Sequence, residues 1–345
     1  MKFSNNQCTI TDKWNYNNMR VIWLENDLIK IGVLVGRGAD IFEFRYKPQD
    51  LNFLLRLPGD IKNPSQVFAQ KRDTNNQMED YYYGGWQETL PNSEPFNYRG
   101  ASLGQHGEVW GIPWDYAILE DNDEQVSFKC WTRPMRTPLL VEKTLTITKN
   151  SPILNIKASV KNEGHTHYDM VWGQHIAFGL PFLEDETKIN INATKMIAEP
   201  IMDNNRRFKP GIETNWPAAV TVNGQTDDAS IIPKAGASPY LDLSYLSGFG
   251  EVGKYTIMNT KKQIGFGLEW DASFFKYVWC WQDRYGTLDA PFWGNAYTVA
   301  LEPWTTKWTD DPQSSIDRGE WLRLEAMETV NTELNAFSVD ESNDQ

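Results

Sequence analysis

Three polar side chains lie in surroundings that suit proton transfer. His106 stands among glycines in the stretch GQHGEVW, and His175 interrupts the apolar run VWGQHIAFGLPF. Glu302 ends the apolar stretch AYTVALEPW, directly before Pro303. Burial at the end of a strand raises the pKa of a carboxyl group toward neutrality, where imidazole also exchanges protons. These residue types predict general acid–base chemistry at a partly buried site.

A glycine-rich loop has the composition of a ligand-binding segment. The stretch YYYGGWQETLPNSEPF, residues 81–96, combines a Gly-Gly pair with an aromatic plate and several hydrogen-bonding side chains. Glycines let the backbone approach a ligand, and a few polar groups can fix the orientation of that ligand. We expect ligand contacts from four residues of this loop: Trp86, Gln87, Glu88 and Asn92.

Two other kinds of catalytic site find weaker support. His165 and His167 would share one face of a strand and could bind zinc, but they follow the turn-like KNEG and no third ligand is evident. One stretch matches GxSxG, GASLG at residues 100–104, but no helical pattern follows it as a nucleophile elbow requires, which disfavours a serine hydrolase of that type. We therefore expect neither a metal site nor covalent serine chemistry.

Alternation of apolar and polar residues with period two dominates the chain. Residues 141–148 and 154–161 alternate in this way, and the turn-like TKNSP joins them into a hairpin. The stretch KYTIMNTKKQIGFGLEW predicts a second hairpin, turning at residues 259–262. Further strands are expected at residues 19–24, 28–35, 275–281 and 297–301. Many short strands with turns between them predict an all-β sandwich or barrel.

Helical periodicity is scarce. Residues 320–334 contain helix-forming residues, yet their first half alternates with period two and is expected to be a strand. No internal repeat and no Pro/Gly/Ser-rich linker divides the chain. We expect one β domain over residues 1–337, followed by a frayed acidic tail at residues 338–345.

The composition disfavours several classes of partner. The net charge is −13, whereas a general nucleic-acid binder or a binder of anionic membranes needs a basic face. The three cysteines, Cys8, Cys130 and Cys280, are widely spaced and form no CxxC pair, which is typical of reduced thiols. The first residues lack the apolar core of a signal peptide, and no apolar stretch approaches the length of a membrane span. We expect a cytoplasmic protein that binds neither nucleic acid nor membrane.

An ordered set of short motifs resembles the aldose 1-epimerase (galactose mutarotase-like) superfamily. The set begins with GRGADIFEFRYK, residues 36–47, and continues with the Gly-Gly loop. It goes on with His106-Gly107 ahead of a tryptophan, then a strand ending in Gln174-His175, and finally a strand ending in Glu302-Pro303. The near-terminal RGEW is also similar to the family's last turn. The resemblance spans nearly the whole chain, and the loop GGWQETLPN is closer to outlying members than to the galactose-active branch.

This resemblance implies a fold and a reaction. The fold is a large antiparallel β-supersandwich that binds a small-molecule carbohydrate in a cleft on one concave sheet. The resemblance implies that Glu302 takes the proton from the C1 hydroxyl, that a protonated His175 donates to the ring oxygen, and that His106 stabilises the charge that develops near the ring. Ring opening, rotation about C1–C2 and reclosure then exchange the anomers, and the reaction needs no cofactor.

Several residues are candidates for selecting the sugar. The family's hydroxyl-binding aspartate corresponds best to Asp242, with Glu251 as the alternative. Trp110 offers a second aromatic plate near His106. Arg133 and Arg136 would bind a phosphate or a uronate if they pointed into the cleft, although covering a strand edge explains them better.

Two further functions fit the same architecture. A non-catalytic sugar-binding or sugar-sensing protein would keep the cleft without turnover, but such a protein needs no acid opposite a base. A polysaccharide lyase would use Tyr81–Tyr83 and Arg99, but the 345 residues leave no room for the helical domain usual in those enzymes. A sugar mutarotase is therefore the leading hypothesis.

Overall fold

The larger of two antiparallel sheets contains twelve strands. The computed structural model describes residues 7–66, 77–201, 205–308 and 311–342. In this sheet the strands follow the order β1-β2-β3-β4-β6-β14-β25-β24-β21-β16-β17, and β5 pairs with β4. The strands are β1 (Thr9–Tyr16), β2 (Met19–Glu25), β3 (Ile29–Leu34), β4 (Asp40–Tyr46), β5 (Leu51–Asn52), β6 (Trp86–Thr89), β14 (Gly173–Phe178), β16 (Lys195–Ala198), β17 (Glu213–Asn215), β21 (Tyr240–Ser247), β24 (Tyr277–Arg284) and β25 (Tyr297–Trp304).

The second sheet contains nine strands in the order β20-β15-β22-β23-β27-β12-β11-β10-β9. Its strands are β9 (Asp115–Asp121), β10 (Gln125–Thr132), β11 (Leu139–Thr148), β12 (Ile153–Asn162), β15 (Thr187–Ile191), β20 (Ile231–Ile232), β22 (Val252–Asn259), β23 (Ile264–Asp271) and β27 (Thr329–Asp340). Both predicted hairpins are confirmed here, as the pairs β11–β12 and β22–β23.

Short elements complete the described chain. Three two-stranded pairs are β7 (Phe96–Tyr98) with β8 (Ala101–Leu103), β13 (Tyr168–Met170) with β26 (Leu322–Leu324), and β18 (Ala218–Val220) with β19 (Thr226–Asp228). The helices are α1 (Gln77–Tyr81), α2 (Pro312–Asp317), and the 3-10 turns η1 (Lys47–Gln49) and η2 (Val109–Gly111). None of the helices in the described part of the chain is long and apolar enough to cross a membrane.

The C-terminal region differs in part from the sequence-based expectation. The ambiguous segment 320–334 contains β26 and the start of β27, so its first half is a strand as expected and its second half is a strand as well. β27 continues to Asp340, because Ser338 and Asp340 pair with β23. The prediction of a frayed tail from residue 338 is therefore wrong for its first three residues, and residues 343–345 lie outside the described residues.

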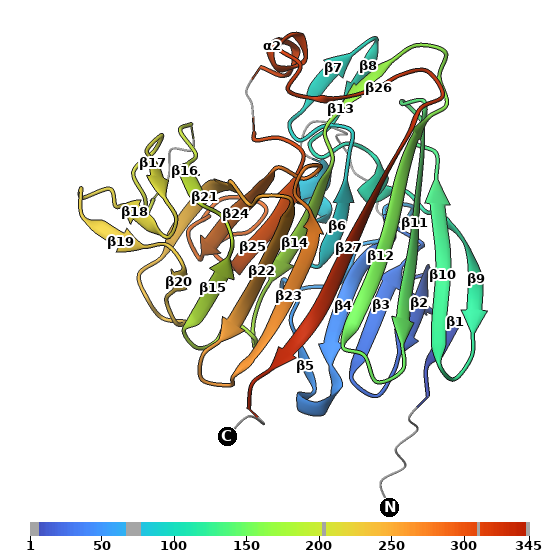
Figure 1. The fold of residues 1–345 in the computed structure, drawn as a ribbon, viewed down its shortest axis with the longest axis horizontal. Helices are drawn as coiled ribbons and strands as arrows, with labels where there is room; N and C mark the ends of the chain where they lie inside the picture. The colour runs from blue at the N-terminus through green and yellow to red at the C-terminus, as the bar shows by residue number, and fades with distance from the viewer. Residues whose placement is uncertain (1–6, 67–76, 202–204, 309–310, 343–345) are drawn as a thin grey trace, which may run out of the picture.

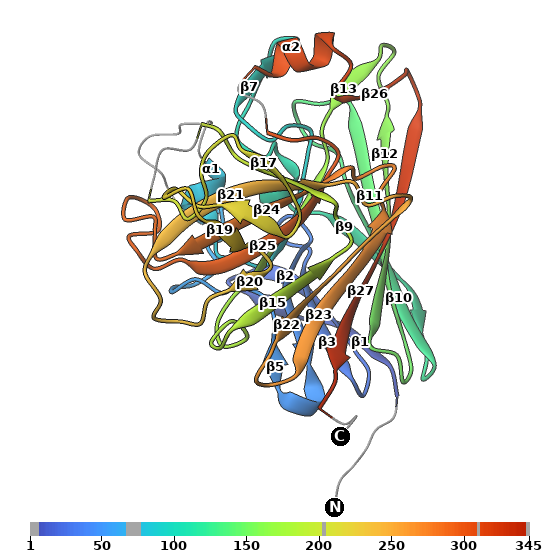
Figure 2. The same cartoon turned by 60° about the vertical axis from the view of Figure 1, so that its left-hand side comes forward.

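The two sheets lie face to face as layers, with the nine-stranded sheet in front of the larger one in Figure 1 and the layering seen from the side in Figure 2. Phe178 of the larger sheet packs on Phe266 of the smaller one, with 5.0 Å between ring centroids. The Tyr255 hydroxyl of the smaller sheet donates to the backbone oxygen of Leu301 in the larger one. These contacts belong to one apolar cluster between the sheets. The expected all-β, antiparallel architecture is confirmed.

Period-two alternation decides which side chains point away from this core. In β14, Ile176 and Phe178 face the smaller sheet, so the alternate residues His175 and Ala177 face outward. In β24, Val278 and Cys280 belong to the core, and the tryptophans beside them face outward. The outer face of the larger sheet therefore carries polar and aromatic side chains from several strands.

Candidate active site

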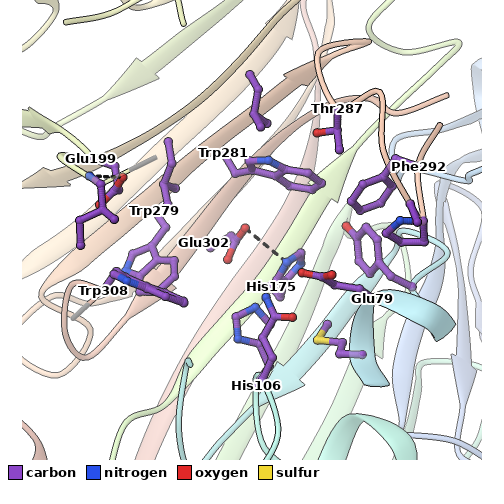
Figure 3. Close-up of a pocket in the computed structure, with 18 residues that line it drawn as sticks. Glu79, His106, His175, Glu199, Trp279, Trp281, Thr287, Phe292, Glu302 and Trp308 are labelled. Carbon is purple, nitrogen blue, oxygen red and sulfur yellow. Dashed lines mark hydrogen bonds and ion pairs between the residues drawn. The ribbon is translucent and has the colours of Figure 1, made fainter. Parts of the chain in front are cut away.

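A cavity of about 450 Å³ opens on the outer face of the larger sheet (Figure 3). Its size is typical of pockets for small molecules. The described residues that line it come from α1, from the turn before η2, from the loop after β24, and from the central strands. They are Met78, Glu79, Tyr82, Gln105, His106, His175, Glu199, Ile201, Leu241, Leu243, Trp279, Trp281, Thr287, Ala290, Pro291, Phe292, Glu302 and Trp308.

His175 and Glu302 face each other across neighbouring strands. The register of β14 against β25 sets the two residues opposite each other, so both side chains emerge on the outer face. His175 Nε2 lies 3.7 Å from Glu302 Oε1, the contact dashed in Figure 3. Because the two side chains are 10% and 3% exposed, little water screens their interaction. The arrangement places a proton donor beside a proton acceptor.

His106 reaches the same cavity from a tight turn. Its ring centroid lies 5.4 Å from that of His175. The Nδ1 atom of His106 lies 2.8 Å from the backbone oxygen of Ser93, and because that oxygen can only accept, Nδ1 carries the proton. The other ring nitrogen, Nε2, is therefore left as a hydrogen-bond acceptor.

A hydrogen bond from Trp304, whose ring is stacked on a second tryptophan, fixes the Glu302 carboxyl group. Trp304 Nε1 donates to Glu302 Oε2 over 2.9 Å, and the Trp304 ring stacks on Trp279 at 4.4 Å. Burial raises the pKa of Glu302 to about 8, and the hydrogen bond from Trp304 offsets only part of this effect. The carboxyl group therefore keeps its proton near neutral pH.

Burial acts in the opposite direction on the two histidines. It lowers the pKa of His175 to about 3, helped by the nearby His106, and it lowers the pKa of His106 to about 4. The His175–Glu302 pair holds the same number of protons in two states. In one state His175 is neutral and Glu302 is protonated, and in the other His175 is charged and Glu302 is ionised. The resting placement of the shared proton is thus the reverse of the sequence-based expectation, because both groups are buried.

The binding candidates on β6 do not line the cavity. Gln87 lies on the outer face beside His175, but its amide donates to the Gly84 oxygen and to Asp40. Glu88 faces the other sheet, where Lys143 of β11 lies 3.5 Å away. Trp86 is buried and donates to the Gln174 side chain. We correct the expectation for these three residues, because the donor groups of Trp86 and Gln87 and the carboxylate of Glu88 are held by partners inside the protein and none of the three lines the cavity.

Asn92 and Trp110 support the turn that carries His106 and do not line the cavity themselves. The Asn92 amide donates to the backbone oxygens of Glu94 and Gly104. Trp110 Nε1 donates to the backbone oxygen of Gly107. Both residues therefore hold the turn in place, in contrast to the ligand contacts expected from the sequence.

The substrate-binding residues expected in other segments of the chain also do not line the cavity. Leu241 and Leu243 line the cavity, so Asp242 between them points to the opposite face, where Arg206 Nε lies 3.0 Å from its carboxylate. Arg133 is exposed and pairs with a surface glutamate, and Arg136 donates to a backbone oxygen. The alternative residue, Glu251, is exposed outside the cavity.

Several cavity residues escaped the sequence analysis, although some left a signal. Glu199 precedes Pro200 at the end of β16, which repeats the Glu-Pro pattern of Glu302. Trp279 and Trp281 alternate in YVWCWQDR, so period two places both on one face. Among the described residues, no group of three or more His, Cys, Asp or Glu side chains is arranged to hold a metal ion.

Comparison with known protein families gives one match. The model of a domain of unknown function, DUF4432, matches residues 17–233, more than half of the 345-residue chain. The chain belongs to the DUF4432 family. The matched region of this DUF4432 member contains His106 and His175 and ends before Glu302. A search of curated proteins found no match.

Solved structures place the DUF4432 chain in a known fold. A candidate aldose 1-epimerase from Klebsiella pneumoniae superposes with a TM-score of 0.71 at 10% identity, over 96% of this chain and 83% of the other. A galactose mutarotase-like protein from Clostridium acetobutylicum gives 0.63 at 15% identity, over 97% and 99% of the chains. A galactose mutarotase related enzyme from Lactobacillus acidophilus gives 0.60 at 15% identity, over 94% and 98%. The expected galactose mutarotase-like β-supersandwich is confirmed, at the low identity of an outlying branch.

Proposed function

We propose that this protein is a sugar mutarotase of the aldose 1-epimerase type. The observation that carries the proposal is the meeting of His106, His175 and Glu302 in one cavity, although 196 positions separate the first from the last (302 − 106). A facing imidazole and carboxyl group supply the two proton transfers that opening a hemiacetal requires. Similarity to mutarotase-like folds supports the same reaction.

The reaction uses the single proton that His175 and Glu302 share. Sugar hydroxyls that donate to Glu302 favour its ionised form, so the shared proton moves to His175. Glu302 then removes the C1 hydroxyl proton while His175 protonates the ring oxygen. The C1–ring-oxygen bond breaks, a carbonyl forms at C1, and reclosure after rotation gives the other anomer. Each turnover returns the proton to the pair.

The remaining cavity walls position the sugar. His106 Nε2, an acceptor, can take a hydrogen bond from a sugar hydroxyl. Trp279, Trp281 and Trp308 give broad apolar surfaces on which the C–H face of a sugar ring can stack. These contacts hold the ring between the donor and the acceptor, which reduces the entropic cost of the proton transfers.

Glu302→Gln tests the proposal because it keeps the size of the side chain and removes the base. Saturation-transfer NMR with free aldoses, deoxysugars, uronates and hexose phosphates measures anomeric exchange directly. For a sugar that the wild type exchanges, we expect the variant to be slower by about 10²–10⁴-fold with binding retained.

Glu43→Gln is the matched control, since it makes the same change in the same sheet outside the cavity. It should exchange sugars at the wild-type rate. Unchanged exchange in Glu302→Gln would remove Glu302 from the mechanism. Binding without exchange of any sugar by the wild-type protein would favour the sugar-sensing alternative.

A further inference from the structure

A second polar cluster lines the cavity on the α1 side, beyond the three proposed catalytic residues. Glu79 of α1, Tyr82 just after α1, and Gln105 beside His106 all contribute to the wall. In Figure 3 Glu79 lies on the side opposite Glu199. The Gln105 side chain hydrogen-bonds to the Glu79 carboxylate, and because a carboxylate only accepts, the Gln105 amide nitrogen is the donor.

This cluster contains polar atoms without partners. Gln105 Oε1 and the Tyr82 hydroxyl are buried and make no hydrogen bond within the described structure. Unpaired buried polar atoms are costly, and where they line a cavity they mark positions that a polar ligand satisfies. Gln105 Oε1 and the Glu79 carboxylate accept only, so they require a ligand group with several donor hydrogens.

Aromatic rings stand beside these acceptors. The ring centroids of Tyr82, Trp281 and Phe292 lie 6.1 to 6.2 Å from one another. The faces of such rings attract cations. An aromatic wall next to a carboxylate and two neutral acceptors therefore has the features of an ammonium site.

The charge around the cavity agrees with this reading. The ionisable side chains among its described lining residues are Glu79, Tyr82, His106, His175, Glu199 and Glu302, and no lysine or arginine occurs among them. Burial raises the pKa of the Glu79 carboxyl, which shows that its charged form is poorly solvated. A bound cation would offset this cost, whereas a phosphate or a carboxylate would increase it.

We propose that Glu79, Gln105 and Tyr82 bind the ammonium group of an amino sugar. The inference rests on the proposed sugar mutarotase function and specifies its substrate class. Ammonium supplies three donors, which matches the three acceptors, and its charge pairs with Glu79. The proposal also explains why Arg133 and Arg136 lie outside the cavity, because this substrate carries no anionic group.

Comparison of matched sugars tests the inference. The sugars are D-glucosamine, D-glucose, N-acetyl-D-glucosamine and D-glucuronate, at about pH 6.5, below the ~7.7 of an ordinary α-amino group. Calorimetry gives their binding constants and exchange NMR gives kcat/KM. We expect D-glucosamine to be favoured over D-glucose by about tenfold, with D-glucuronate weakest.

Two variants locate the ammonium subsite. Glu79→Gln should bring the glucosamine-to-glucose ratio close to one, and Tyr82→Phe, which removes only a hydroxyl, should lower it about threefold. Asp80→Asn is the control, since Asp80 is an exposed neighbour on α1 outside the cavity. That variant should leave the ratio unchanged.

The outcomes separate the two proposals. Exchange of neutral sugars without a glucosamine preference, or a preference that survives Glu79→Gln, would overturn the ammonium subsite and leave the mutarotase proposal standing. Preferential binding of D-glucosamine that depends on Glu79, without exchange of any sugar, would overturn the mutarotase proposal and leave the subsite standing.

Discussion

At the residue scale, the proposed chemistry depends on how burial distributes one proton between His175 and Glu302. Burial favours the neutral form of each group, which raises the carboxyl pKa and lowers the imidazole pKa. The 3.7 Å separation lets the proton pass to the histidine once a ligand stabilises the carboxylate. The pair is therefore able to start from a neutral state and to act through a charged one.

The raised pKa of Glu302 predicts how stability changes with pH. The folded protein keeps the carboxyl proton up to about pH 8, whereas the unfolded chain loses it near 4.5. The contribution of Glu302 to stability is therefore complete below pH 4.5 and is lost as the pH rises through about 8. Relative to Glu302→Gln, the wild-type unfolding free energy should fall over this range by up to about 1.4 kcal/mol per pH unit.

Chemical denaturation of both proteins from pH 4.5 to 9 measures this difference. The two histidines are shared by both proteins, so their own loss of stability below about pH 6.5 cancels in the comparison. A constant difference across the range would show that Glu302 has an ordinary pKa in the folded protein.

At the element scale, strands place some site residues and turns place others. β14 and β25 present His175 and Glu302 through their register, which the pairing of whole strands fixes. His106 instead depends on a turn in which its own φ is +60° and that of Gly107 is +74°. A Cβ on Gly107 would lie 1.9 Å from the Leu90 oxygen. Glycine is therefore required at this position.

Gly107→Ala should disturb the turn and the chemistry together. We expect a loss of about 2 kcal/mol or more in unfolding free energy, because the new methyl group meets backbone and the positive φ adds strain. Displacement of His106 should slow anomeric exchange by about tenfold. Thermal denaturation and exchange NMR measure the two effects.

Gly100→Ala separates strain from steric clash. Gly100 has a φ of +88°, but nothing lies within 4 Å of its Cβ position, so this change should cost only about 1 kcal/mol and leave exchange unchanged. Equal losses in the two variants would contradict the role given to the contact with Leu90.

The sequence predicted several of the strands and singled out three polar residues that the structure brings to one cavity, because both leave local signals. Period two marked β11, β12, β22 and β23, and the scarcity of histidine drew attention to His106 and His175. The binding residues were missed because the direction of a side chain depends on distant partners. The Glu88 carboxylate points between the two sheets, where it pairs with Lys143 of β11. No pattern within the loop indicates this pairing.

At the scale of the whole molecule, two stacked sheets leave one broad face free for a ligand. The inner faces form an extensive apolar cluster, which holds the central strands in register while their outer faces carry His175, Glu302 and tryptophan side chains. The cavity joins residues from position 78 to position 308, so the site forms only when the whole sandwich has folded. The overall charge of −13 has the same sign as the acidic lining residues of the cavity.

The most direct test of the central claim is a double-mutant cycle on anomeric exchange, with His175→Asn, Glu302→Gln and both changes combined. Residues that act as one proton-transferring pair lose nearly all of their effect when either is removed. We expect the double variant to exchange a substrate sugar within about tenfold of the slower single variant. Losses that multiply, so that the double variant is slower by the product of the two single effects, would show that His175 and Glu302 act independently and would contradict the account.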